Sequence, residues 1–307
     1  MSDKTGIAWT NATWNPVTGC TKVSQGCKHC YAEREWGRLS ANPKATTYYG
    51  REFTDIQCHP DRLTEGPVRW RKPRMIFVNS MSDLFHEQVP FEFIDEVFEV
   101  INCSPMHTFQ ILTKRPKRML EYFQRPEIAW AVEDGPLDNA WLGVSVEDQA
   151  TANERIPLLL QTPAAVRWVS AEPLLNKIDL THLELDPFNY YNALTGDTLI
   201  LGRTIIPMEN TLSWVVAGGE SGNSARALDA RHLYALVSQC KDTGTPIFVK
   251  QLGYRFMDLD NAFYGAGIQT VDGKAKMVNR AGADLNEWPE GLRVREWPAA
   301  AVSNVSV

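Results

Sequence analysis

Short apolar runs alternate with amphipathic stretches along most of this 307-residue chain. The runs are rich in Val, Ile, Phe and Trp and are mostly continuous, which is typical of strands buried on both faces of a sheet. We predict strands over Ile7–Trp14, Met75–Asn79, Thr108–Leu112, Ala140–Val146, Val166–Ser170, Ser213–Ala217 and Ile247–Lys250.

Helical periodicity is clearest in Phe91–Asn102, where apolar residues recur every three or four positions and form one stripe. Gly244 follows another periodic stretch and is a typical stop signal for a helix. We predict helices over Phe91–Asn102, Cys30–Leu39, Pro116–Phe123, Gln149–Leu160 and Ala230–Thr243.

Strands that alternate with helices predict parallel βαβ units, and therefore an α/β protein. About seven strands favour a partial or nearly closed (β/α) TIM-type barrel, with an open doubly wound sheet as the second choice. Three stretches interrupt the alternation and predict lids, small hairpins or an appended segment: Ser40–Pro73, Thr181–Leu212 and Gly253–Val307. We therefore expect a barrel over residues 1–252, with insertions near 40–73 and 181–212. A C-terminal extension over 253–307 is expected to pack on it.

The composition is that of an ordinary globular protein, with 44% hydrophobic and 22% charged residues, which excludes a disordered or fibrous chain. No apolar run approaches the roughly 18–20 residues that a membrane-spanning helix needs. The first residues also lack the apolar segment of a secretory signal. The net charge of −6 argues against a general polyanion binder and leaves room for a local basic patch.

The strongest chemical signal is a loop that contains Cys20, Cys27 and Cys30, directly after the first predicted strand. Thiolate is the soft ligand that iron–sulfur clusters and zinc prefer, so three nearby thiols predict a metal centre. A cluster held by three cysteines leaves one iron open, whereas zinc would need a fourth ligand such as His29 or His59. Reduced thiols without a metal are the remaining alternative.

The other three cysteines are scattered, and we expect Cys58, Cys103 and Cys240 to be buried apolar residues.

Polar residues follow nearly every predicted strand, at the ends where the active site of a parallel barrel gathers. They are Ser80, Ser82, Asp83, Thr113, Lys114, Arg115, Ser145, Glu147, Asp148, Ser170, Glu172, Glu220, Ser221, Lys250 and Gln251. Charges near a buried mouth cost desolvation energy, which favours a functional interpretation of the set. Single members such as Ser145 and Asp148 would equally serve as helix N-caps.

A three-cysteine loop after the first strand of a (β/α) barrel resembles the radical S-adenosylmethionine (radical SAM) superfamily. More closely, the chain resembles a family of uncharacterised phage and bacterial proteins related to that superfamily, and more distantly spore photoproduct lyase, a DNA-repair enzyme. The segments that carry the resemblance are Trp9–Cys20, Cys30–Glu33, Asn79–His86, Ile111–Pro116, Trp141–Asp148, Val169–Leu175, Val216–Gly222 and Phe248–Gln251. Six residues separate Cys20 from Cys27, where the common superfamily spacing has three.

The resemblance implies a cytoplasmic radical SAM enzyme. In such an enzyme a [4Fe–4S] cluster on Cys20, Cys27 and Cys30 cleaves S-adenosylmethionine to a 5′-deoxyadenosyl radical, which abstracts hydrogen from a substrate. A nucleic acid or nucleoside is the implied substrate, as for a lyase or another enzyme of DNA modification or repair. An electron donor such as flavodoxin or ferredoxin is the implied partner.

The resemblance also implies roles for individual residues of this chain, according to their chemical type and their position after the strands. The residues implied in binding S-adenosylmethionine are His29, Ser80, Ser82, Asp83, Lys114, Ser145, Glu147, Glu172, Gly218 and Gly219. His29 occupies the place of the aromatic residue that packs on the adenine, and the two glycines would let the backbone approach the ligand. The implied catalytic residues are Lys114, Glu172 and Lys250.

Two basic runs, Val68–Arg74 and Lys114–Arg118, would suit a nucleic-acid backbone, although such runs are more often solvated faces. Two hypotheses from other classes stay open. One is a non-catalytic zinc protein that binds nucleic acid, and the other is an iron–sulfur redox sensor that does not use S-adenosylmethionine.

Overall fold

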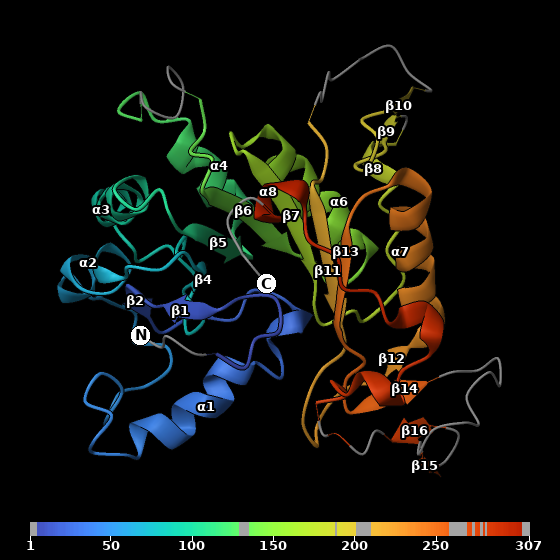
Figure 1. The fold of residues 1–307 in the computed structure, drawn as a ribbon, viewed down its shortest axis with the longest axis horizontal. Helices are drawn as coiled ribbons and strands as arrows, with labels where there is room; N and C mark the ends of the chain where they lie inside the picture. The colour runs from blue at the N-terminus through green and yellow to red at the C-terminus, as the bar shows by residue number, and fades with distance from the viewer. Residues whose placement is uncertain are drawn as a thin grey trace. The chain divides into compact units, whose positions relative to one another are not determined.

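The computed structural model of the chain describes residues 5–128, 135–187, 189–200, 210–257, 269–271, 274–276, 279 and 281–302. Its main sheet has seven parallel strands in the order β1-β4-β5-β6-β7-β11-β13 (Figure 1). They are β1 (Ala12–Trp14), β4 (Met75–Val78), β5 (Thr108–Thr113), β6 (Ala140–Ser145), β7 (Val166–Ala171), β11 (Trp214–Gly218) and β13 (Ile247–Gln251). Neighbouring strands follow one another in chain order, as in a (β/α) barrel. The predicted α/β class and partial barrel are confirmed.

The predicted helices are present with nearly the predicted bounds. They are α1 (Tyr31–Ser40), α3 (Phe91–Asn102), α4 (Pro116–Phe123), α6 (Gln149–Gln161) and α7 (Ala230–Thr243). The stripe of α3 is buried, and Gly244 ends α7 with a φ of 72°, a conformation that favours glycine. None of the helices in the described residues is both long and apolar enough to cross a membrane.

The first strand is shorter than predicted, because β1 begins at Ala12 rather than at Ile7. The side chain of Thr10 donates a hydrogen bond to the carbonyl of Met75 (2.9 Å), and Asn11 Oδ1 accepts one from the Met75 N–H (2.9 Å). The Asn11 side chain thus takes the Met75 N–H in place of a backbone carbonyl, and the regular ladder starts only afterwards.

Small sheets and short helices occupy the three interrupting stretches. The first stretch holds β3 (Gln57–Cys58), which pairs antiparallel with β2 (Val17–Thr18), then α2 (Asp61–Thr64) and η2 (Pro67–Arg69). The second holds the antiparallel strands β8 (Leu183–Asp186), β9 (Asn189–Tyr191) and β10 (Thr198–Ile200). The third holds β14 (Arg255–Met257), β15 (Gln269–Val271) and β16 (Lys274–Lys276), which form a sheet with β12 (Leu228–Asp229), followed by η3 (Leu285–Glu287), η4 (Glu290–Leu292) and α8 (Ala299–Val302).

The chain divides into two compact units. Unit 1 consists mainly of the residues up to Gly143, and unit 2 consists of Val144–Gln161 and Arg167–Ala299. Each has its own buried aromatic residues, for example Trp14 and Phe109 in unit 1. The expected division at residue 252 stays a prediction.

Within unit 2, the C-terminal segment runs alongside β13. The Val249 N–H donates to the carbonyl of Val294 (2.9 Å), and the Glu296 N–H donates to the carbonyl of Ile247 (3.0 Å). Gly282 accepts from the Leu252 N–H (2.9 Å) at a point where a side chain on Gly282 would overlap the backbone of Gly253. Backbone hydrogen bonds therefore join this segment to the sheet.

Candidate metal and cofactor site

The three-cysteine loop lies in unit 1, between β2 and α1. It contains the short helix η1 (Gln25–Cys27), and Cys30 occupies the N-cap position of α1. The thiols of Cys20, Cys27 and Cys30 are free, and each residue is partly exposed. Gly19, at the start of the loop, has a φ of 92° and lies against the backbone of Asp55, where a side chain would not fit.

Electrostatic effects connect the three thiols. The pKa of the Cys20 thiol is raised to about 12, chiefly by burial. The Asp83 carboxylate and the Cys27 thiol contribute to this increase, and the Arg115 guanidinium opposes it. The pKa of Lys22 is raised chiefly by its hydrogen bond to Glu33, and the Cys30 and Cys27 thiols add to the increase. The thiols thus share one neighbourhood with two cations.

Among the described residues, no group of three or more His, Cys, Asp or Glu side chains is arranged as a ready-made metal site. In chemical type the donor set nevertheless fits an iron–sulfur cluster, because it consists of three free thiols with cations beside them.

Arg115 forms the centre of a buried network beside Cys20. Its side chain is only 4% exposed, and it follows β5 at the N-cap position of α4. Its Nε donates to Glu87 (2.9 Å), and its Nη1 donates to Asp83 Oδ2 (3.2 Å) and to Cys20 Sγ (3.8 Å). Its Nη2 donates to the backbone carbonyl (3.2 Å) and the Oγ1 (2.9 Å) of Thr21. We call these five residues the Arg115 network.

Asp83 connects the ends of β4 and β5. Its Oδ1 accepts hydrogen bonds from Thr113 Oγ1 (2.7 Å) and the Phe85 N–H (3.0 Å), and its Oδ2 accepts from the Lys114 N–H (3.0 Å). The Asp83 carboxylate therefore binds backbone and side-chain donors of its own unit. Its predicted contact with S-adenosylmethionine stays a prediction.

His86 fixes Thr21 from the other side. Its Nδ1 accepts a hydrogen bond from the Gln88 N–H (3.1 Å), so the ring proton is on Nε2, which lies 2.8 Å from Thr21 Oγ1. Burial lowers the pKa of His86, and Arg115 lowers it further, which keeps the ring neutral. Thr21 Oγ1 therefore accepts from both His86 and Arg115.

The predicted serines of unit 1 bind the backbone and side chains near β1 and β2. Ser80 Oγ donates to Asn15 Oδ1 (3.1 Å), and Ser82 Oγ donates to the carbonyl of Val17 (2.9 Å). Asn79, with a φ of 60°, accepts from the Val17 N–H (3.1 Å). These contacts support the turn that leads into the cysteine loop.

His29 and Lys114 are half-buried in unit 1. His59 Nε2 lies 2.8 Å from Thr18 Oγ1, and the pKa of His59 is lowered to about 4, chiefly by burial and next by the nearby Arg62. The binding roles expected of these residues stay predictions.

The scattered cysteines were only partly as expected. Cys240 is buried in α7, but Cys58 is partly exposed and Cys103 is exposed, so the expectation is wrong for Cys103. Cys103 follows the last turn of α3, where the chain leaves the apolar stripe, and its Sγ donates to Glu99 (3.4 Å).

In unit 2, two of the predicted catalytic residues contact each other. Lys250 Nζ lies 3.0 Å from Glu172 Oε1, and Ser170 Oγ donates to Glu172 Oε2 (3.2 Å). Both charged side chains are partly buried, with 25% of Lys250 and 14% of Glu172 exposed. They stand at the carboxyl ends of β13 and β7, and Glu172 precedes a cis peptide bond to Pro173.

The other predicted site residues of unit 2 bind side chains and backbone groups of the protein itself. Glu147 is buried and pairs with Arg155 (3.2 Å), whose Nη1 also donates to the carbonyl of Ser145 (2.8 Å). Asp148 Oδ1 accepts from the Thr151 N–H (2.8 Å) as a helix cap, which confirms that alternative.

Gly218 and Gly219 permit a close approach of two backbone segments. A side chain on Gly218 would lie 2.9 Å from the carbonyl of Gln251 and 3.1 Å from Glu172, and one on Gly219 would lie 2.5 Å from the carbonyl of Leu252. Packing against β13 therefore requires these glycines, and their contact with a ligand stays a prediction. Glu220, which follows them, pairs with Arg226.

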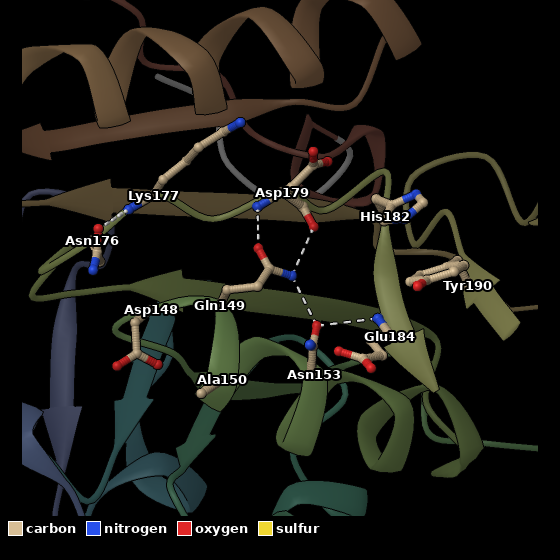
Figure 2. A pocket seen from close by; sticks show the side chains of 10 residues that line it. All are labelled: Asp148, Gln149, Ala150, Asn153, Asn176, Lys177, Asp179, His182, Glu184 and Tyr190. Atoms are coloured by element: carbon tan, nitrogen blue, oxygen red, sulfur yellow. Dashed lines mark hydrogen bonds between the residues drawn. The ribbon is translucent and has the colours of Figure 1, made fainter. Parts of the chain in front are cut away.

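A polar pocket of about 550 Å³ lies in unit 2, next to the start of α6 (Figure 2). Gln149 Nε2 donates to Asn153 Oδ1 (2.8 Å), and Gln149 Oε1 accepts from the Asp179 N–H (2.6 Å). The rings of His182 and Tyr190 stack with their centroids 3.9 Å apart. In Figure 2 the side chains of Gln149 and Asn153 bind each other and the backbone of Asp179 and Glu184. The pocket contains none of the predicted cofactor residues.

Sequence reasoning missed the Arg115 network. Arg115 and Asp83 were noticed as polar residues after strands, but nothing in the local pattern indicates that they bind Thr21, Cys20 and Glu87. The one available signal was the position of Arg115 directly after a strand, next to a predicted binding residue.

The fold and the site together define an α/β half-barrel protein with a three-cysteine loop near the carboxyl ends of its first strands. The chain belongs to the family described as "Protein of unknown function (DUF5131)", whose sequence model matches residues 4–287. Neither a curated protein nor a solved structure matches the chain.

Proposed function

We propose that this protein is a radical SAM enzyme in which Cys20, Cys27 and Cys30 hold a [4Fe–4S] cluster. The observation that supports the proposal is that one short loop carries three free thiols, with the Arg115 guanidinium on the sulfur of Cys20 and the Lys22 cation in the same loop. When bound, the cluster would supply electrons for the reductive cleavage of S-adenosylmethionine and so begin hydrogen abstraction from a substrate.

Assembly of the cluster would change the loop. The Cys20 thiol is protonated at neutral pH because its pKa is about 12, so its proton must leave when the sulfur binds iron. The sulfurs of Cys27 and Cys30 would have to converge with that of Cys20. The positive charges of Arg115 and Lys22 would partly offset the negative charge of the bound thiolates.

The proposed roles of the other residues follow their chemistry. Glu172 and Lys250 form a carboxylate–ammonium pair that can hold or move a proton, and Lys114 is the third proposed catalytic residue. The proposed contacts with S-adenosylmethionine come from His29, Ser80, Ser82, Asp83, Lys114, Ser145, Glu147, Glu172, Gly218 and Gly219. A flavodoxin or ferredoxin would donate electrons, and the need for reduced thiols favours the cytoplasm.

A nucleic acid is the proposed substrate, and Val68–Arg74 is the proposed contact with its backbone. Arg69, Arg71 and Lys72 are exposed in this segment, and Trp70 is held in place by Arg74, whose guanidinium lies 4.8 Å from the centre of its ring. The second basic run, Lys114–Arg118, is less accessible to a nucleic acid, because the side chain of Arg115 is buried in the Arg115 network.

Salt dependence tests the contact with a nucleic-acid backbone. We expect a single-stranded oligonucleotide to bind with an affinity that falls with salt. A triple variant R69Q/R71Q/K72Q should reduce the magnitude of that slope by about 2, at about 0.7 for each lost contact. The control K44Q/K177Q/K241Q removes the same charge from exposed positions outside both basic runs. Equal slopes in the two variants would contradict the contact.

Anaerobic reconstitution tests the function itself. We expect a brown protein with about four irons per chain, which releases 5′-deoxyadenosine when given dithionite, S-adenosylmethionine and the oligonucleotide. The variants C20A, C27A and C30A should each lose the iron, whereas the control C103A should keep it because Cys103 is far along the chain, after α3. K250M should keep the iron and lose turnover.

Other outcomes would decide between the remaining hypotheses. Zinc without iron would overturn the proposal and favour the zinc protein that binds nucleic acid. An intact cluster that never binds S-adenosylmethionine would favour the redox sensor. A cluster that binds S-adenosylmethionine and releases no 5′-deoxyadenosine, with or without the oligonucleotide, would contradict the proposed cleavage.

A further inference from the structure

All five N–H groups of the Arg115 guanidinium have an acceptor in the structure. Nε donates to Glu87, the two protons of Nη1 match Asp83 and Cys20, and the two protons of Nη2 match the carbonyl and the hydroxyl of Thr21. Arginine has five donors in a planar fork, whereas lysine has three donors on one atom. Lysine therefore cannot reproduce this arrangement.

Hydrogen bonds to Thr113, the last residue of β5, connect the fork to the sheet. Asp83, one of its acceptors, also accepts from Thr113 Oγ1 and from the Lys114 N–H, at the end of β5. The Arg115 N–H itself donates to Thr113 Oγ1 (2.8 Å). The guanidinium is thus a rigid group that reaches from the strand ends to the start of the cysteine loop.

Contacts to Thr21 and Cys20 hold the loop at its first residues. Thr21 accepts from Arg115 at both its carbonyl and its hydroxyl, and His86 Nε2 donates to the same hydroxyl. The contact between Arg115 Nη1 and Cys20 Sγ places a positive N–H donor on the sulfur. One residue therefore contacts both the backbone and the proposed ligand atom of the loop.

We propose that Arg115 is a positioning residue that fixes the Cys20 sulfur and the start of the cysteine loop, and that it raises the reduction potential of the cluster bound there. The second part rests on the proposed function, and the first part does not. A hydrogen bond to a ligand sulfur and a nearby positive charge stabilise the more negative, reduced cluster. Loss of Arg115 would then move the potential to more negative values.

Hydrogen exchange of the metal-free full-length protein tests the first part. We expect amides in residues 20–30 to exchange at least about tenfold faster in R115Q than in the wild type. R115K should be intermediate, because it keeps the charge and loses the fork. The control K117Q changes an exposed cation two residues away in α4 and should exchange like the wild type.

The midpoint potential of the reconstituted protein tests the second part. It is measured in a redox titration that is followed by the electron paramagnetic resonance signal of the reduced cluster. We expect a shift to more negative potential in R115Q, a smaller shift in R115K and no shift in K117Q. The variant T21V removes the hydroxyl acceptor and keeps the contact with the Cys20 sulfur. It should therefore speed exchange in the loop and leave the potential nearly unchanged.

The outcomes separate the two claims. Unchanged exchange in both R115Q and T21V would overturn the positioning of the loop. An unchanged potential in R115K and R115Q would overturn the effect on the cluster. If the wild type takes up no iron, the proposed function and the claim about the potential fail together, and the exchange result still decides the positioning role. If R115Q fails to fold, R115K and T21V supply the same comparisons.

Discussion

Two arginines, one in each unit, have equal burial and different partners. Arg115 in unit 1 and Arg155 in unit 2 both have side chains that are 4% exposed, and both follow strands of the main sheet. Arg155 binds Glu147 and the carbonyl of Ser145, and both of these residues lie at the end of β6, just before α6. Arg115 binds groups from two segments that are distant in the sequence, Cys20–Thr21 and Asp83–Glu87, and one of these groups is a thiol.

The difference shows that burial of a charged side chain does not by itself indicate whether the residue serves stability or a functional site. The Glu147–Arg155 pair joins the end of β6 to α6, and its charges offset each other within one turn region. The Arg115 network joins the strand ends to a loop that carries three free thiols. We therefore expect loss of Arg155 to affect folding most, and loss of Arg115 to affect the loop most.

The largest expected effect is on stability in unit 2. R155A should lower the free energy of unfolding by about 3–5 kcal/mol, because it breaks a buried ion pair by removing the cation beside the Glu147 carboxylate. The double variant E147L/R155M should recover much of this loss, since it removes both charges. Urea unfolding measures both. A loss below about 1 kcal/mol in R155A would break the comparison, because the pair would then contribute no more than a surface ion pair.

Replacing one glycine by alanine in each unit should change the free energy of unfolding by a smaller amount, with opposite signs in the two units. G219A in unit 2 should destabilise by about 1–3 kcal/mol, because its side chain would lie 2.5 Å from the carbonyl of Leu252. G37A in α1 of unit 1 should stabilise by about 0.5–1 kcal/mol, because a side chain there meets nothing within 4 Å. Thermal unfolding measures both. The same sign in both variants would show that the packing around Gly219 adapts.

The smallest effect is the dependence of stability on pH. Burial lowers the pKa of His59 to about 4 and also lowers those of His86 and His107, all three in unit 1. An unfolded histidine has a pKa near 6.5, so between about pH 6.5 and 4 the unfolded chain binds more protons. The free energy of unfolding should therefore fall as the pH is lowered through that window.

The variant H59Q isolates one of these contributions. Glutamine can still bond with Thr18 and does not titrate, so the slope of stability against pH should be shallower than in the wild type. Urea unfolding at pH 7, 6 and 5 measures the slope. Identical slopes would mean that His59 has the same pKa in the folded and unfolded chains.

Most of the fold was predictable because its signals are local. The stripe of Phe91–Asn102 and the stop at Gly244 each lie within one element, and both helices have the predicted bounds. The first strand was overestimated, because the side chains of Thr10 and Asn11 bind the backbone of Met75, sixty-odd positions away. Such a contact leaves no periodicity in the sequence.

The same argument applies to the site. The cysteine loop was predictable because its three ligand candidates lie close together in the sequence and follow a strand. The network beside it was not, because Arg115 and Thr21 are 94 positions apart and meet only in the fold. Glu172 and Lys250 were each noticed singly, and only the structure shows that they form a pair.

The segment that runs alongside β13 has a consequence for how the molecule meets other chains. A strand at the border of a sheet exposes unpaired N–H and C=O groups, which are a template for aggregation. Val294 and Glu296 bond with the backbone of β13, and they lie beyond residue 287, where the match to the family ends. A chain shortened to the residues of the family match would expose the backbone N–H and C=O groups of β13. The residues after 287 therefore protect this edge of the sheet from pairing with a strand of another chain.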